Sequence, residues 1–171
     1  MNKVFSKLTA KPILTRLVRA NGVPLAGQEI LIEANKVQCA ALAKLNKLAA
    51  LNRLQALLTV KPRGKELHVW GTITADVVYT CVFTLEQFPF SLVEKVNAIF
   101  APEKEVQKPK HLDLSFGDDD REALIDGEAD IGALVQELFQ LALDPYPHKP
   151  GTNFINVTVP DNVRPVRIIK N

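Results

Sequence analysis

Few residues in this 171-residue chain have the types and spacing that catalysis or metal binding requires. The histidines, His68, His111 and His148, occur singly and form no HxxxH pair. Cys39 and Cys81 stand 42 residues apart with no CxxC, which is typical of a reduced cytosolic protein. The sequence contains no glycine-rich phosphate loop, GxSxG motif or Rossmann fingerprint. We therefore expect a protein that is not an enzyme and has no metal or cofactor.

An acidic run, DDDREALIDGEAD, is the one stretch that invites a calcium or magnesium interpretation. EF-hand spacing fails from Asp118 because Ala123 stands where the loop needs glycine. It fails from Asp120 because Leu124 occupies a ligand position. A magnesium-dependent nuclease built on 118–120 would lack a second ligand cluster. The pattern favours a solvated acidic loop.

Charge is distributed unevenly along the chain. Residues 1–65 hold twelve Lys/Arg against two acids, whereas residues 66–171 hold nine against seventeen. Such asymmetry is typical of a surface that meets a polyanion, although the two halves could also neutralise each other within one fold. The cluster KPRGK at a predicted hairpin tip could follow a phosphate backbone. The candidate nucleic-acid-binding residues are Arg16, Arg19, Lys44, Lys47, Arg53, Lys61, Arg63, Lys65, His148 and Lys149.

The elements that would position these residues begin with extended pieces over 1–32, interrupted by Pro12 and the turn NGVPLAG. A stripe of Val37, Ala41, Leu45 and Leu48 predicts a helix over about 34–48. Period-two alternation predicts a strand over 53–61, with one long helix to residue 58 as the alternative. The turn residues of KPRGK predict a hairpin at 61–65.

The clearest pattern is LHVWGTITADVVYTCVFTLE, where apolar and polar residues alternate and β-branched residues are frequent. Its predicted apolar face consists of Val69, Gly71, Ile73, Ala75, Val77, Tyr79, Cys81 and Phe83. The run exceeds one typical strand, so we expect a bend or bulge near Gly71 or Ala75, or two strands. The stretch FPFSLVEKVNAIFAP predicts a further strand ending at Pro102. The outward residues His68, Trp70 and Thr72 offer one aromatic ring for base stacking, which is not the paired-aromatic pattern of a single-strand platform. If RNA is bound, shape and phosphate contacts should dominate over base stacking.

Polar, interrupted sequence over about 103–122 predicts a mobile acidic loop. A short strand at 123–125 and an Asp126-Gly127 turn should follow. Asp130 should cap a helix with the apolar face Ile131, Leu134, Val135, Leu138 and Ala142, with Phe139 alongside. This helix should stop before Asp144-Pro145, and the prolines of DPYPHKPG should hold an extended segment that presents His148 and Lys149 as a docking edge.

These elements predict an α+β protein, an antiparallel sheet packed by two main helices, in which the sheet could close into a barrel. We expect one domain over 1–171, a weak strand in FINVTV and a loosely ordered basic tail over about 160–171. No run of 18 apolar residues predicts a membrane span, and the N-terminus lacks the features of a secretory signal. We expect a cytoplasmic protein, with an organellar transit peptide as the alternative for the acid-free N-terminus.

Three stretches in order, VWGTITADVVYTCVFTLEQFPF, FAP and LIDGEADIGALVQELFQLALDPYPHKPG, carry a family resemblance. Over about residues 66–151 the chain resembles the YceD family, the large ribosomal RNA subunit accumulation proteins, in the form of α-proteobacterial members. The basic stretch EANKVQCAALAKLNKL matches more loosely. The positions of the family type are Gly71, Cys81, Asp126, Gly127, Asp130, Leu134 and Pro145, which we expect to be mostly architectural. Many members have a second cysteine where this chain has Thr84, so a zinc role does not transfer.

The resemblance implies a non-enzymatic bacterial factor that supports processing or accumulation of large-subunit ribosomal RNA. Its expected partner is that RNA or a pre-ribosomal particle, bound through the basic N-terminal half. The alternative is a protein–protein adaptor that docks a basic ribosomal protein through the acidic segment 103–130.

Overall fold

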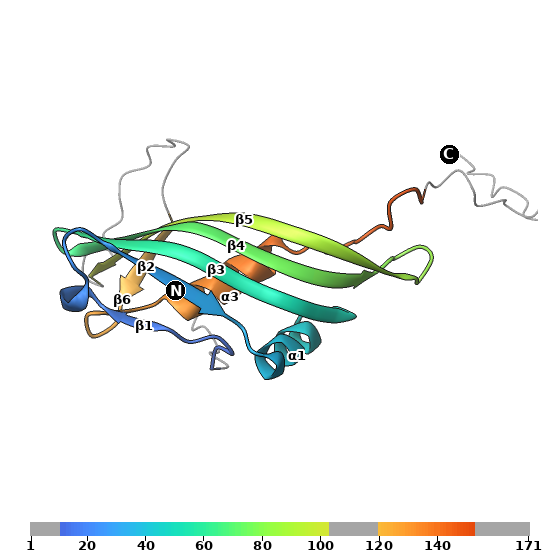
Figure 1. Ribbon diagram of the computed structural model, residues 1–171, viewed down its shortest axis with the longest axis horizontal. Coiled ribbons are helices and arrows are strands. Elements are labelled where there is room, and N and C mark those ends of the chain that lie inside the picture. The colour runs from blue at the N-terminus through green and yellow to red at the C-terminus, as the bar shows by residue number, and fades with distance from the viewer. Residues whose placement is uncertain (1–10, 103–119, 153–171) are drawn as a thin grey trace, which may run out of the picture.

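A long, open β-sheet dominates the computed structural model, which describes residues 11–102 and 120–152 (Figure 1). Its strands, in spatial order, are β2 (Gln28–Glu33), β3 (Ala50–Arg63), β4 (Glu66–Thr80), β5 (Gln87–Pro102) and β6 (Asp120–Leu124). Each neighbouring pair from β2 to β5 is antiparallel, and β6 pairs with β5 in parallel. The α+β prediction is confirmed. The barrel is not found: within the described residues β2 and β6 form two separate edges.

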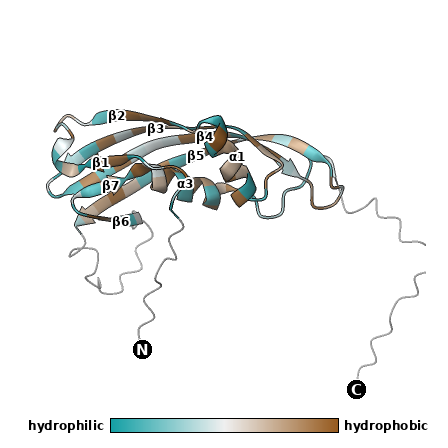
Figure 2. Cartoon of the chain, turned by 90° about the horizontal axis from the view of Figure 1, so that it is seen from below, coloured by the Kyte–Doolittle hydropathy of each residue, from teal (hydrophilic) through white to brown (hydrophobic). Residues whose placement is uncertain are grey.

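Both helices cover the same face of this sheet. They are α1 (Lys36–Leu45) and α3 (Ile131–Ala142), and their buried side chains join the inward residues of the strands in one apolar core. Beside α3 a second, two-stranded sheet pairs β1 (Leu17–Arg19) with β7 (Glu128–Asp130), and the short 3-10 helix η1 (Ala20–Gly22) follows β1. Figure 2 shows the helices and the small sheet together on one side of the long strands. No described helix covers the other side, which we call the outer face.

The long alternating run forms one uninterrupted strand, β4, of 15 residues. The two-strand alternative is wrong, because β3 and β5 hydrogen-bond along both sides of β4 and support its whole length. The irregularity lies in β3, where Asn52 is the extra residue between the pairs Leu51–Val77 and Arg53–Asp76. The predicted hairpin is confirmed, with Gly64 in the left-handed region (φ 63°) between β3 and β4.

The predicted strand ends earlier than expected at its C-terminal side. β4 stops at Thr80, so Cys81 and Phe83 belong to the turn that leads to β5 rather than to the apolar face of a strand. The N–H of Cys81 donates to the carbonyl of Glu86 (2.9 Å), and the N–H of Leu85 donates back to Cys81 (3.0 Å). These hydrogen bonds close the chain into a turn where the hydropathy pattern continued as if extended.

Helix α1 exists, and the alternative of one long helix to residue 58 is wrong, but the predicted buried stripe is also wrong. Val37 and Leu45 are exposed, whereas the buried side chains are those of Cys39, Leu42 and Ala43. Asn35 and Gln38 form a capping box that begins the helix at Lys36. The N–H of Ala34 donates to the carbonyl of Leu54 (3.0 Å) just before it. The capping box and this hydrogen bond determine which face of the helix is buried. The sequence did not determine that face, because alanines lie on several sides of the helix.

The predicted helix that Asp130 caps and that stops before Asp144 is confirmed as α3. The Asp130 side chain accepts from the N–H of Ala133 (3.1 Å), and Ile131, Leu134, Val135 and Phe139 are buried. After Ala142 the chain is extended, and the N–H of Asp144 donates to the Tyr79 hydroxyl (3.1 Å).

Two further predictions concern the ends of the described C-terminal segment. β6 begins at Asp120, so the last three residues of the predicted acidic loop are strand. The loop over 103–119 and the FINVTV strand and basic tail beyond 152 lie outside the described residues. In the described part of the chain, no helix is long and apolar enough to cross a membrane.

Candidate nucleic-acid interface

The outer face of the sheet is polar, with a narrow apolar centre. Side chains alternate between the two faces along β2 to β5. Those on the outer face include Glu29, Leu31, Glu33, Arg53, Gln55, Leu57, Thr59, Lys61, Arg63, Glu66, His68, Trp70, Thr72, Thr74, Asp76, Val93, Lys95 and Asn97. Among them Leu31, Leu57, Trp70 and Val93 are large apolar side chains that remain 42–68% exposed. No described helix covers this face, and these four side chains are accessible to a macromolecule.

Trp70 lies near the middle of this face, opposite Thr59 of β3 and Asn97 of β5. Lys61 is two residues beyond Thr59, and Lys95 is two residues before Asn97. These lysines are therefore diagonal neighbours of Trp70 on opposite sides, each at a backbone separation of about 7–8 Å. An exposed indole ring flanked by two ammonium groups can stack on a base while the ammonium groups contact phosphates.

The cations near Trp70 have no ion-pair partner in the described part of the chain. No described residue forms an ion pair with Lys61, Arg63 or Lys95. Arg53 differs, because its Nε donates to Asp76 (2.9 Å) and its charge is paired. Free positive charge on the outer face is therefore concentrated toward the hairpin end and β5.

Acidic groups on the same face are partly engaged. Glu66 forms an ion pair with Arg121 (2.9 Å), and its other oxygen lies 3.4 Å from Nε2 of His68. Glu33 accepts a hydrogen bond from the Gln55 amide (2.8 Å). With Glu29, it gives the β2 edge a negative character. An approaching polyanion would therefore meet β3–β5 rather than β2.

The remaining candidates lie elsewhere. Arg16 and Arg19 belong to the segment of β1 on the helix-covered side, and Arg19 Nε donates to Glu128 (2.7 Å). Lys44 lies in the last turn of α1, and Lys47 follows that helix near the start of β3. Because β3 has 14 residues at about 3.3 Å each, Lys44 and Lys47 lie roughly 40 Å from the hairpin tip. The structure groups Lys61, Arg63 and Lys65, together with Arg53 further along the same face, and separates the rest.

His148 and Lys149 are held against the turn between β4 and β5. The His148 ring stacks on Phe83 with centroids 4.7 Å apart. Lys149 Nζ donates to Glu86 (2.8 Å). This hydrogen bond and the charge of Lys149, together with a hydrogen bond from the Thr84 hydroxyl, lower the pKa of Glu86. The extended segment after α3 thus docks within the chain, and the charge of Lys149 is paired.

Cys81 lies under the same segment and is buried. The backbone N–H of Lys149 donates to its Sγ (3.4 Å), and this bond, with a second from Thr84, lowers the pKa of Cys81 to about 6 against the opposing effect of burial. For Cys39 burial outweighs a backbone hydrogen bond from Leu54, and its pKa is raised. In the described ranges, no group of three or more His, Cys, Asp or Glu side chains could hold a metal ion.

Lys95 is the residue of the outer face that sequence reasoning missed. The signal was present, since Val93, Lys95 and Asn97 alternate with the inward residues Leu92, Val96 and Ala98 of a predicted strand. The sequence does not give the register between β4 and β5, and that register places Lys95 diagonally from Trp70.

This chain thus combines an open α+β sheet, one helix-covered face and one partly basic face around a tryptophan. The family model of the large ribosomal RNA subunit accumulation protein YceD matches residues 69–159, more than half of the chain, so the protein belongs to the YceD family. The name describes an accumulation factor rather than an enzyme. No curated protein and no solved structure matches the chain significantly. The α-proteobacterial form stays a prediction.

Proposed function

We propose that this protein binds large-subunit ribosomal RNA, free or in a pre-ribosomal particle, and so supports its processing or accumulation in the cytoplasm. The family name supports the choice of RNA. The observation that carries the proposal is the exposed Trp70 ring between two lysines that no described residue pairs. No other described part of the chain combines an exposed aromatic ring with free cations on both sides.

In this proposal a single-stranded RNA segment crosses β3, β4 and β5. One base stacks on Trp70, which is 42% exposed and needs no rearrangement to be reached. Lys61 and Lys95 contact phosphates on either side of that base, and Arg63 and Lys65 extend the contact to the hairpin tip. Phosphate contacts dominate, so the affinity depends strongly on salt and weakly on base sequence.

The test measures binding of transcribed large-subunit ribosomal RNA fragments across a series of salt concentrations. The triple variant Lys61→Ala/Arg63→Ala/Lys65→Ala should reduce the slope of log affinity against log salt by up to about 2, since each lost single-strand phosphate contact contributes roughly 0.7. Trp70→Ala should weaken binding about tenfold or more through lost stacking, with the slope unchanged.

Two substitutions serve as matched controls. Lys36→Ala removes an exposed lysine from α1, and it should change RNA affinity less than Lys95→Ala does. Tyr146→Ala removes an aromatic side chain that is 70% exposed but lies away from the outer face, and should leave affinity unchanged. The proposal is wrong if Lys36→Ala weakens binding as much as Lys95→Ala, or Tyr146→Ala as much as Trp70→Ala. It is also wrong if RNA does not bind at all.

A further inference from the structure

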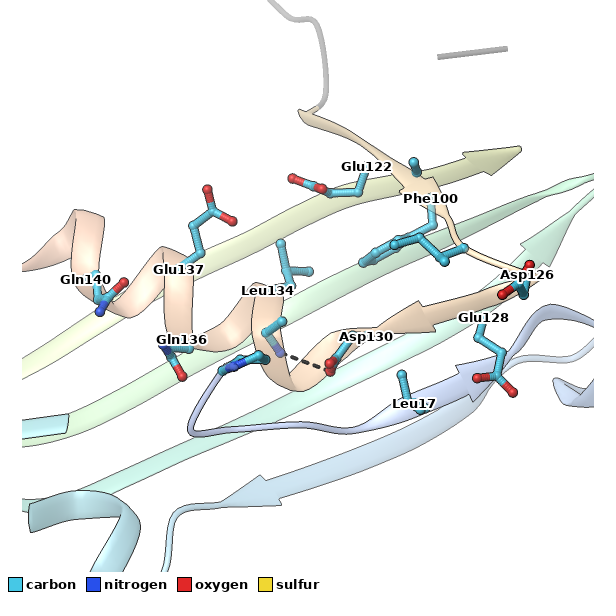
Figure 3. Close-up of a pocket in the computed structure, with 14 residues that line it drawn as sticks. Leu17, Phe100, Glu122, Asp126, Glu128, Asp130, Leu134, Gln136, Glu137 and Gln140 are labelled. Atoms are coloured by element: carbon cyan, nitrogen blue, oxygen red, sulfur yellow. Dashed lines mark hydrogen bonds between the residues drawn. The ribbon is translucent and has the colours of Figure 1, made fainter. Parts of the chain in front are cut away.

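A groove of about 710 Å³ lies on the helix-covered side, between β6, the small sheet and α3 (Figure 3). Phe100 and Leu134, both nearly fully buried, form its floor. Leu17 of β1 and Ile125 after β6 line it and are 57% and 72% exposed. These four residues come from three stretches that lie far apart in sequence, at Leu17, at Phe100 and at 125–134, so tertiary packing creates this apolar depression.

Acidic side chains surround the apolar floor, and no lysine or arginine lines the groove. The carboxylates are those of Glu122, Asp126, Glu128, Asp130 and Glu137. Asp130 is engaged within the chain, where it accepts from the N–H groups of Arg16 (2.9 Å) and Ala133 (3.1 Å). Asp126, in the turn before β7, is exposed and has no partner among the described residues.

The rim already holds one cationic side chain. Nε of Arg19 donates to Glu128 at 2.7 Å, although the Arg19 side chain is 81% exposed. A guanidinium group thus contacts a carboxylate at the edge of the groove while most of its surface stays exposed to solvent. The same carboxylate lining would repel a phosphate backbone, which makes this groove the electrostatic opposite of the Trp70 region.

We propose that the groove binds a Lys/Arg-rich segment of a protein partner. An apolar side chain of that segment enters between Leu17 and Ile125, and its flanking cations face the rim carboxylates. Apolar contact supplies affinity, and charge complementarity selects a basic partner. This site is separate from the outer face, so its failure would leave the RNA proposal intact.

The experiment uses the full chain and a fluorescein-labelled peptide, KRKLKRKLKR, with the acidic peptide EDELEDELED for comparison. The groove variant is Asp126→Asn/Glu137→Gln, and its matched control Glu29→Gln/Glu33→Gln removes two carboxylates from the β2 edge instead. Both variants lose the same net charge, so bulk attraction of a cationic peptide falls equally. The groove variant should weaken peptide binding about tenfold, as loss of two ion pairs predicts, and the control less than twofold.

A second pair of variants tests the apolar contact. Ile125→Ala should weaken the basic peptide severalfold, whereas Leu25→Ala, at a residue 84% exposed and outside the groove, should not. RNA affinity should be unchanged in the groove variant, in Ile125→Ala and in Leu25→Ala, whereas the Glu29→Gln/Glu33→Gln control removes negative charge from the outer face and should not weaken RNA binding. Equal weakening by the groove variant and its control, comparable binding of the acidic peptide, or absence of peptide binding would overturn the proposal. Self-association abolished by the groove variants would identify a second copy as the occupant and would also overturn it.

Discussion

Gly132 gives the sharpest test of how α3 packs against the chain before β1. It is the second residue of α3, where alanine is normally the better helix former. A Cβ at this position would lie 2.6 Å from the backbone nitrogen of Arg16 and 2.7 Å from the carbonyl carbon of Thr15. Both are backbone atoms, so no side-chain rotation relieves the overlap. Gly132→Ala should therefore destabilise the protein although it raises helix propensity.

The magnitude follows from the displacement that the methyl group imposes. Ordinary contact begins near 3.4 Å, so the Thr15–Arg16 backbone must move by about 0.8 Å from its 2.6 Å separation. That backbone makes two hydrogen bonds of 2.9 Å, from the Arg16 N–H to Asp130 and from the Ile131 N–H to the Arg16 carbonyl. Overpacking costs about 1–3 kcal/mol, each weakened hydrogen bond up to about 1, and the gain in propensity is at most about 1. We expect a net loss of roughly 1–3 kcal/mol.

Urea unfolding measures this loss through the transition midpoint at constant slope. Gly22→Ala is the matched control, because the nearest atom to its Cβ would be Arg19 Cβ at 3.7 Å and its φ is not positive. This control should be neutral or stabilising by up to about 1 kcal/mol. A Gly132→Ala protein as stable as the parent chain, or a loss of equal size in both variants, would refute the packing argument.

Two further predictions concern the segment after α3. Tyr79→Phe removes the hydroxyl that accepts from the Asp144 N–H, and should lower the free energy of unfolding by about 1 kcal/mol in urea titration; an unchanged midpoint would contradict it. The pKa of Cys81 is about 6 in the folded protein against an ordinary 9.0, so the unfolded state binds more protons between these pH values. Stability should therefore rise from pH 6 to 9, and Cys81→Ser should flatten this rise; a parallel pH profile for the variant would show that another group is responsible.

Local patterns predicted the elements that depend on near neighbours in sequence. The β3–β4 hairpin follows from turn residues at 61–65, and the cap of α3 follows from Asp130 before an apolar stripe. β4 follows from alternation, although its end at Thr80 did not, because the hydrogen bonds that bend 81–86 leave no trace in hydropathy.

Features that depend on distant contacts escaped prediction. The parallel pairing of β6 with β5 and the pairing of β1 with β7 join segments far apart in the chain. The cluster on the outer face could be predicted only in part. Alternation along the strands places Lys61 and Trp70 on one face, but the position of Lys95 beside Trp70 depends on the register between β4 and β5. The acidic groove forms where β6, the small sheet and α3 come together, so only the tertiary structure reveals it.

Helix α3 is tied to the rest of the molecule at both of its ends. At its start Asp130 and Ile131 bond to the Arg16 backbone, and just beyond its end the Asp144 N–H bonds to Tyr79 near the far end of β4. Helix α1 is also tied to the sheet on either side, by the Ala34 N–H to Leu54 and by the Ala49 N–H to Val78. Neither helix can leave the sheet without breaking the hydrogen bonds that flank it, so both should unfold together with the core. The wall of the groove that α3 forms therefore shares the stability of the core.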